Sequence, residues 1–517
     1  MPVVDNAECH QYSTWTGLIY IFNLIVGTGA LTLPAAFANA GWILSLSIIL
    51  LLAFMSYVTV TFVIEAMSVA NAILSRRKID RRSYEFDSGD SAILISATAT
   101  NRRPQREERD PLIPPELAYH QPSESFSAMS DFEIKERTEM GRMAAMFFGR
   151  SGVYLFYACL AIYLYGDLAI YVAAVSTSLR DVFCTFVPAN YSIDGNYTEI
   201  PDSEVCWIMN GTSIDRFQAY RIFTVMFILA LGPFAFCNVS KTKYLQIGTT
   251  IMRWLAFGVM ISLALKILIK GEGKGHPIAA NFYGLPNLFG VCVYSFMCHH
   301  SLPSLVTPIN EKKNLFRLFM MDYGLITVFY LLLAFTGIFA FDNLRDLYTL
   351  NFEPNTASPN ISILMKVINY FLALFPVFTL STNFPIIAIT LRNNLKSLFN
   401  IHDDSGIGLS GLTHYCSQVL FPLAAIIPPF IVAVFVENVQ VLVGITGSYA
   451  GNAIQYIIPV MLCYRARQCC MSSFGMDVNP YASPFRHKWW LWFVFTWAVV
   501  SVGFVTVNHV LSLTRFL

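Results

Sequence analysis

The sequence predicts an all-α membrane protein that crosses the bilayer about eleven times. Its 517 residues are 55% hydrophobic, 15% aromatic and only 13% charged, whereas soluble domains are ordinarily about one quarter charged. Apolar runs of about 20 residues recur along the chain, and each is long enough to cross the hydrocarbon layer as a helix. The formal net charge of +1 gives no reason to expect a nucleic-acid partner.

The predicted spans follow one another along most of the chain. The first has no basic residues ahead of it and no small-residue cleavage site after it, so we interpret it as a retained span and not a signal peptide. Only Glu437 and Asn438 separate the ninth span from the tenth, which predicts a tight helical hairpin. The spans cover residues 15–38, 42–65, 152–179, 219–237, 247–268, 285–308, 319–341, 361–391, 414–436, 439–464 and 489–511.

The distribution of basic residues predicts the orientation. Arginine and lysine gather in alternate loops, and such loops face the cytosol in most membrane proteins. This rule places the short tail 1–14 and the long loop 67–146 in the cytosol. It places the last residues, 513–517, in the lumen or outside the cell. Lys270 and Lys274 are the main exceptions, because they fall on the opposite side.

The loop at residues 183–216 has the features of an oxidising compartment. Cys184 and Cys206 are predicted to lie clear of the membrane there, and we expect them to form a disulfide. Glycosylation sequons cluster in the same loop, opposite the basic loops, and another follows later on the same predicted face. The acceptor residues are Asn190, Asn196, Asn210 and Asn360.

The cytosolic loop at residues 67–146 differs in composition from the rest of the chain. It is rich in charged residues, serine and proline, so we expect most of it to be disordered. Its segment ERDPLI resembles an acidic dileucine sorting signal, formed by Glu108, Leu112 and Ile113. Such a signal would bind clathrin adaptors and favours a lysosomal or late endosomal membrane over the plasma membrane. The alternative is a chance match, since such hexapeptides are common.

The first span contains residues that disrupt helices. Its segment NLIVGTGALTLP, residues 23–34, includes Gly27, Gly29 and Pro34. A helix break at membrane depth is tolerated where it lines a cavity or contacts protein. There the exposed N–H and C=O groups of the two half-helices can bind a carboxylate and a cation. The alternative is close helix packing, for which small residues are equally suited.

The sixth span shows the same kind of interruption. It contains Gly290, the polar Ser295 and His299, and the helix breakers Pro303 and Pro308. Breaks at the first helix of each five-helix half are expected of an inverted repeat with a substrate site between the halves. Spans one to five and six to ten would be the halves, with the eleventh added. The order of the segments carries this inference, since no residue-level repeat is evident.

Four segments resemble the amino acid/auxin permease family. They are NLIVGTGALTLPAAFANAGW in the first span, YLYGDLAIY in the third, YSFMCHHSLPSL in the sixth and GITGSYAGNAIQYIIP in the tenth. The matches occur in the family's order, and the long cytosolic loop and eleven spans look similar to one animal branch of it. The resemblance implies a LeuT-like fold and proton- or sodium-coupled amino acid transport in a lysosomal or plasma membrane.

The resemblance also implies the positions of the sites. The substrate carboxylate and amine would lie against the turn Gly27, Thr28, Gly29 and Ala30, with Tyr294, Ser295 and Phe296 opposite. A sodium ion would bind Asn23 together with Thr379, Ser381 and Thr382, because oxygen ligands suit a hard cation. Alternatively, these hydroxyls bond to carbonyls of their own helix. Asn383 departs from the family pattern, which leaves the coupling ion open.

Three further polar residues are predicted to lie within the membrane. A buried carboxylate in lipid is costly, so Asp167 could carry a coupled proton, or tyrosines such as Tyr163 or Tyr171 could hold it as a structural link. Arg253 is expected to extend toward the membrane surface, with a pairing role as the alternative. His299 could gate or titrate, and we expect no metal site from its pairing with His300.

The predicted function is secondary active transport of a small amino acid. We find no catalytic set in the spans and expect no enzyme activity and no cofactor, beyond a bound Na⁺ or a transported H⁺. One alternative is a sensor of the same fold that binds an amino acid without moving it. A membrane-embedded enzyme is a further alternative, which predicts turnover without any gradient.

Overall fold

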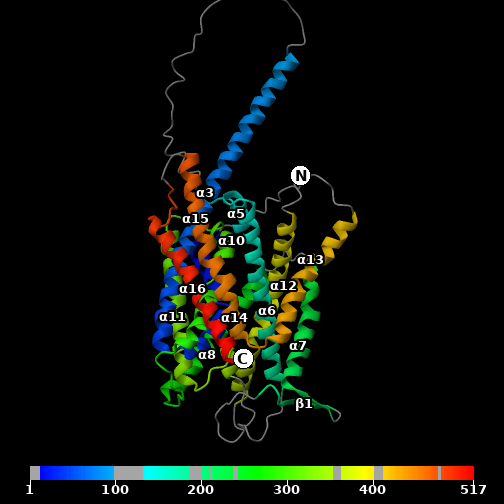
Figure 1. Cartoon of the computed structure of the whole chain (residues 1–517), viewed down its shortest axis with the longest axis vertical. Helices are drawn as coiled ribbons and strands as arrows, with labels where there is room; N and C mark the ends of the chain where they lie inside the picture. The colour runs from blue at the N-terminus through cyan, green and yellow to red at the C-terminus, as the bar shows by residue number, and fades with distance from the viewer. Residues whose placement is uncertain are drawn as a thin grey trace, which may run out of the picture.

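The computed structural model shows a bundle of long helices that lie side by side (Figure 1). It describes residues 12–97, 132–184, 201–209, 212–236, 243–352, 362–400, 411–474 and 479–516. Eight described helices are long and apolar enough to cross a membrane, or nine if the bent pair α1 (Thr14–Ile25) and α2 (Thr28–Ala40) counts as one span. The predicted class, an all-α polytopic membrane protein, is therefore confirmed.

The eight uninterrupted spans described above lie in long helices that short elements connect. The uninterrupted helices and the strands are α3 (Trp42–Ala97), α5 (Met140–Phe147), α6 (Arg150–Phe183), β1 (Val205–Met209), β2 (Thr212–Asp215), α7 (Arg216–Leu231), α8 (Lys243–Ile269), α11 (Leu315–Ala340), α12 (Ile363–Asn400), α13 (Gly411–Phe435) and α16 (Lys488–Phe516). Short 3₁₀ turns are η3 (Gly232–Phe236), η4 (Phe282–Gly284) and η6 (Tyr348–Phe352).

The predicted sixth and tenth spans form interrupted helices. The sixth consists of α9 (Leu285–Ser295), η5 (His299–Ser301) and α10 (Leu302–Val306). The tenth consists of α14 (Val439–Thr446), the π-helical segments η7 (Gly447–Gly451) and η8 (Ala453–Ile457), and α15 (Ile458–Phe474). Single π-helical turns are uncommon and are frequent at functional sites. The prediction did not include this irregularity in the tenth span.

The first span breaks at Val26 and Gly27. The two half-helices are bent by 55°, and Gly27 is the residue that precedes α2. Pro34 lies inside α2 without ending it, because neighbouring segments in a membrane bundle can satisfy the backbone groups that a proline frees. Of the three predicted breakers, only Gly27 therefore lies at the break.

Part of the long loop packs against the bundle. Helix α3 continues to Ala97 and projects from one end of the molecule (Figure 1). The side-chain oxygen of Asn71 accepts hydrogen bonds from the backbone N–H groups of Lys135 (3.2 Å) and Glu136 (2.8 Å). Phe132 and Ile134 are buried, so this segment is packed, unlike the disorder predicted for it. The residues of the dileucine-like motif lie outside the described residues.

The opposite end of the bundle carries the disulfide. Cys184, which follows α6, is bonded to Cys206 in β1, as predicted. Strands β1 and β2 pair as an antiparallel hairpin, which Figure 1 shows at the end away from the α3 extension. The four sequon asparagines, Asn190, Asn196, Asn210 and Asn360, lie outside the described residues.

A buried ion cluster surrounds Asp181 at this same end of α6. Its carboxylate lies 2.6 Å from Arg216, 2.8 Å from Arg180 and 3.3 Å from Arg345. Arg180 also pairs with Glu437 in the α13–α14 connection, and with Asp202 at 2.9 Å. The cluster therefore joins α6 to the start of α7, to the loop after α11 and to the ninth–tenth hairpin.

We expect Asp181→Asn to lower the thermal stability strongly. The carboxylate is 2% exposed, and removing one partner from a buried ion cluster costs about 3–5 kcal/mol because the remaining charges lose their compensation. Asp202→Asn is the matched control, since that side chain is 56% exposed and an exposed pair contributes at most about 1 kcal/mol. Melting temperatures of the purified variants measure both effects. Equal shifts for the two variants would contradict the assignment.

Candidate substrate site

The two broken helices cross in direct contact. Helix α2 packs on α9, and a Cβ atom placed on Gly29 would lie 2.7 Å from the Cα of Ser295. No L side chain can occupy that position without moving the backbone opposite. The glycine is thus required by close approach, and the second half-helix of the first span, α2, touches the sixth helix where α9 ends.

Tyr330 links the two breaks from α11. Its hydroxyl oxygen lies 3.1 Å from the carbonyl oxygen of Ile25 and 2.8 Å from that of Ser295. These carbonyls belong to the last residues of α1 and α9, where helical chains leave acceptors without intrahelical partners. The Tyr330 hydroxyl therefore lies within hydrogen-bond distance of the carboxyl ends of both α1 and α9.

Open space remains beside Gly27. A Cβ atom at this position would meet no other atom within 4 Å, and the residue is only half-buried. Thr28 and Gly29 follow as the first residues of α2, and the first amides of a helix have no intrahelical acceptor. The predicted turn thus combines free main-chain donors with room on one side and close packing on the other.

Asn23 and Arg253 meet next to this break. The guanidinium of Arg253, in α8, donates a hydrogen bond to the backbone carbonyl of Asn23. This corrects the prediction that Arg253 extends toward the membrane surface: a main-chain acceptor in the neighbouring half-helix holds it within the bundle. The side-chain amide of Asn23 is buried, and neither of its polar atoms has a partner among the described residues.

Asp167 joins the third span to the sixth. Its carboxylate accepts a hydrogen bond from the Tyr294 hydroxyl, whereas Tyr163 or Tyr171 had been expected to hold it. The carboxylate is buried, and the ring of Tyr163 lies 6.2 Å from that of Tyr294. The link fixes the orientation of Tyr294, one residue before the close contact at Ser295.

The other residues of the predicted site are distributed differently. Phe296 packs against Tyr323 and Tyr330 of α11, with ring centroids 6.1 Å and 5.3 Å apart. In α12, the hydroxyl of Thr379 donates to Phe375 O (2.9 Å) and that of Thr382 to Thr379 O (2.8 Å). These two threonines therefore bond to carbonyls of their own helix, which was the alternative to sodium binding. Ser381 is half-buried on the same helix.

His299 is fixed on the other side of the sixth-helix break. Its Nε2 lies 2.8 Å from the hydroxyl of Thr59 in α3, and the ring is fully buried. The Nδ1 atom has no hydrogen-bond partner among the described residues. No group of three or more metal-ligating side chains occurs in the described part of the chain.

Sequence reasoning missed three features of this region. Asp322, in α11, is a buried carboxylate like Asp167, although a lone acidic residue in an apolar span was visible in the sequence. Tyr330 was also missed, since nothing near it in sequence indicates its long-range bonds. The π-helical part of the tenth span contains buried Ser448 and Asn452, whose side chains have no partner among the described residues. Its motif had been recognised without a site being assigned to it.

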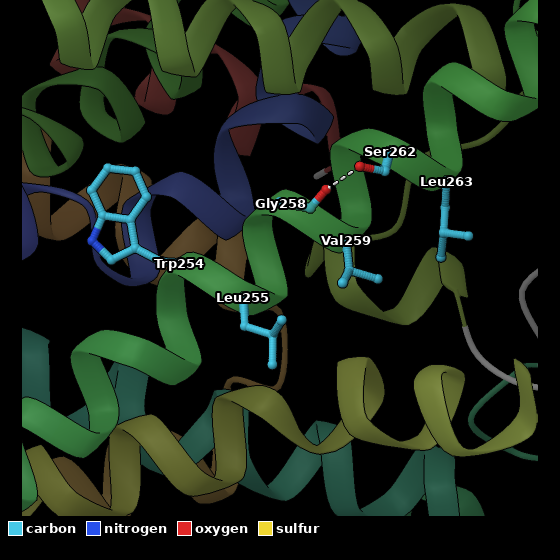
Figure 2. Close-up of a pocket in the computed structure, with 6 residues that line it drawn as sticks. All are labelled: Trp254, Leu255, Gly258, Val259, Ser262 and Leu263. Carbon is cyan, nitrogen blue, oxygen red and sulfur yellow. Dashed lines mark hydrogen bonds between the residues drawn. The ribbon is translucent and has the colours of Figure 1, made fainter. Parts of the chain in front are cut away.

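A hollow on the surface of α8 lies outside this crossing. It has a volume of about 310 Å³ and is lined by Trp254, Leu255, Gly258, Val259, Ser262 and Leu263. Figure 2 shows these residues along one helix, with the Ser262 hydroxyl donating to the Gly258 carbonyl at 2.7 Å. Leu255 is 55% exposed. The hollow is therefore a groove on the outer face of one helix.

The fold has a solved counterpart. The structure of MhsT in complex with L-phenylalanine matches with a TM-score of 0.50 and covers 96% of this chain and 99% of that chain, at 11% identity. At this identity the likeness concerns the fold alone. It confirms the predicted LeuT-like fold.

Sequence comparisons cover nearly the whole chain. Residues 10–86 and 125–507 match the family described as "Transmembrane amino acid transporter protein". "Transmembrane protein 104" of Homo sapiens is 48% identical over 98% of both chains. The "Transmembrane protein 104 homolog" of Drosophila melanogaster is 47% identical over 98% of this chain and 99% of its own, and that of Dictyostelium discoideum is 34% identical.

The fold and the comparisons together define the class: a polytopic membrane protein of the transporter type, built around two broken helices. The chain belongs to the transmembrane amino acid transporter protein family, among the relatives of Transmembrane protein 104. This confirms the resemblance drawn from its first, third, sixth and tenth spans.

Proposed function

We propose that the protein is a secondary active transporter of small amino acids that works by alternating access around its broken first and sixth helices. One observation carries the proposal: the two helices touch at Gly29 and Ser295, next to the break in each, and the Tyr330 hydroxyl lies within hydrogen-bond distance of a carbonyl at both breaks. The family description supports the substrate class, as does the L-phenylalanine in the structurally similar MhsT.

The substrate would bind where main-chain groups are exposed. The amides of Thr28 and Gly29 form the positive end of α2, which favours a carboxylate, and the half-buried space beside Gly27 gives it room. Ala30 continues this turn, and Tyr294, held by Asp167, belongs to the opposite wall. Ser295 and Phe296 would complete this wall only after α2 and α9 move apart. We therefore infer that the structure has the site closed.

Protons are the favoured coupling ion. The guanidinium of Arg253 already binds the carbonyl of Asn23, and a fixed cation beside Asn23 would repel sodium there. Thr379 and Thr382 direct their hydroxyl protons to carbonyls of their own helix. The alternative is a sodium ion bound by Asn23 and α12. The transport assay below distinguishes sodium coupling from proton coupling.

A sensor of the same fold is the second candidate. The extension of α3 beyond the bundle and the segment docked on Asn71 would offer a partner protein a surface that responds to movement of the helices. Such a protein would bind an amino acid without transporting it.

The deciding experiment is uptake of a panel of radiolabelled amino acids into proteoliposomes that contain the purified full-length protein. It is run with and without sodium, at two external pH values. We expect saturable uptake of a small amino acid that increases with an inward proton gradient. Binding without uptake would support the sensor, sodium-dependent uptake would support the α12 site, and product formed in detergent would indicate an enzyme.

We also propose a lysosomal or late endosomal location, with the N-terminus in the cytosol. Adaptor binding through Glu108, Leu112 and Ile113 would direct the protein there, and the four sequon asparagines would be glycosylated on the lumenal side. Alanine at both Leu112 and Ile113 should move the protein to the plasma membrane. Unchanged location of this variant, imaged in cells, would argue against the motif.

A further inference from the structure

Asp322 is a fully buried acid whose carboxylate has no hydrogen-bond partner in the part of the chain that the structure describes. Its exposure is 0%, and neither carboxylate oxygen has a hydrogen-bond partner among the described residues. An ionised carboxylate without partners in a protein interior carries a large desolvation cost, and within a membrane bundle such residues are usually functional. Asp322 therefore needs either a bound proton or a bound cation.

No described cation is paired with Asp322. The titratable groups that interact with it are Cys298 and the adjacent Tyr323. Of the helices packed against α11, α2 has no charged residue and α1 has only the phenol of Tyr20. In α8, Arg253 is bonded to Asn23, and Lys266 is exposed in the last turn. In α3, Glu65 is paired with Arg467, and the basic residues Arg76, Arg77 and Lys78 are exposed. Arg317, on α11 itself, is exposed as well.

The site lies against the break in the sixth helix. The hydroxyl of Tyr323, next to Asp322 in the chain, lies 3.2 Å from Phe296 O and 3.3 Å from the sulfur of Cys298. These are the residues between α9 and η5, where the helix is interrupted. Cys298 in this segment also interacts electrostatically with Asp322, so a change in charge at Asp322 would act on the segment that connects α9 to α10.

A proton fits this site better than a metal ion. One carboxylate, a thiol and a phenol do not supply the six or more oxygen ligands that calcium requires or the octahedral set of magnesium. A proton needs only the carboxylate itself. Release of that proton would require water to reach Asp322, because the ionised form has to be solvated.

We propose that Asp322 is the binding site for the coupling proton, protonated while the sixth-helix break is closed and deprotonated when water enters beside it. The physiological role inferred here, proton coupling, rests on the proposed transport function. The binding of a proton by Asp322 does not depend on that function. Asp167, which already has Tyr294 as its donor, is the positioning residue and not the proton carrier in this scheme.

Infrared difference spectroscopy tests the site without any assumption about transport. The full-length protein in nanodiscs is titrated between acidic and alkaline pH, and the carbonyl stretch of a protonated carboxylic acid is followed. We expect a band in the wild type that disappears in Asp322→Asn, shifts in Asp322→Glu and persists in Asp167→Asn. Asp342→Asn, at an exposed position outside the bundle, is the matched control. A band unchanged in Asp322→Asn, or a dependence on sodium in place of pH, would overturn the proposal.

Substrate binding to the same samples tests the coupling. Acidification should strengthen amino acid binding to the wild type by roughly 5- to 150-fold, the usual range of coupling between two ligands, and Asp322→Asn should remove this dependence. If Asp322→Asn does not fold, Asp322→Glu should retain the dependence with a displaced midpoint. Full pH dependence in Asp322→Asn would refute the inference. If the wild type binds no amino acid at any pH, the proposed function fails, while the infrared result still decides the proton site.

Discussion

Alanine at Gly29 is expected to disable the protein by separating the two broken helices. The added methyl group would lie 2.7 Å from the Cα of Ser295, and because the opposing atom is backbone, the helices themselves have to shift. Overpacking of this kind costs about 1–3 kcal/mol. We therefore expect a clear fall in melting temperature together with a loss of amino acid uptake per folded molecule.

Gly27, two residues earlier, is the matched position for this experiment. A methyl group there meets open space, so Gly27→Ala should keep the melting temperature of the wild type. Gly27→Leu should fill the space beside the first amides of α2 and abolish substrate binding while the fold survives. If Gly27→Leu lowers only the stability and leaves uptake per folded molecule intact, the glycines serve close packing and the substrate site lies elsewhere.

Loss of the bond between Asp167 and Tyr294 should weaken substrate binding without removing its pH dependence. Tyr294→Phe leaves a buried carboxylate without its donor, and an unsatisfied buried group costs about 1–3 kcal/mol. Part of this cost will appear as lower stability. The rest will appear as lower substrate affinity, since Tyr294 precedes the contact at Ser295. Equilibrium binding and melting curves measure the two parts.

Tyr163→Phe is the control that distinguishes loss of the Asp167–Tyr294 hydrogen bond from loss of any phenol hydroxyl near Asp167. Tyr163 is buried beside Tyr294, but the carboxylate accepts its hydrogen bond from Tyr294. We expect Tyr163→Phe to bind substrate like the wild type. Similar losses in both phenylalanine variants would show that the ring environment matters and not the bond. Asp167→Asn keeps an acceptor for the Tyr294 hydroxyl, so its substrate affinity should lie between those of Tyr294→Phe and Tyr163→Phe.

The break in the first helix illustrates what could be predicted from sequence. Glycine lacks a side chain to stabilise a helix, so the segment around Gly27 and Gly29 was a predictable weak point. Which residue breaks the helix was not predictable, because Pro34 has the stronger intrinsic effect on helices and yet lies inside α2. Helix α2 packs against α9 and α11, which are distant in the sequence, so local helix propensity alone does not fix the position of the break.

The hydrogen bond between Asp167 and Tyr294 shows the same limit of sequence-based prediction, here within the candidate site. A buried acid in the third span could be recognised from its position in an apolar run. Its donor could not, because Asp167 and Tyr294 are separated by 127 positions in sequence, and nearer tyrosines were equally suitable chemically. Arg253 and Asn23 are a parallel case, separated by 230 positions.

The sequence alone determined the membrane class, the order of the spans, the disulfide and the two interrupted helices. Each of these depends on local composition or on the spacing of a few residues, which short-range physics translates into structure. Only the tertiary structure decided that Gly29 touches Ser295 and that the Tyr330 hydroxyl lies within hydrogen-bond distance of both breaks. It also decided that the Asp322 carboxylate has no hydrogen-bond partner among the described residues. These facts depend on which distant side chains meet once the helices have packed, and helix packing is a property of the whole bundle.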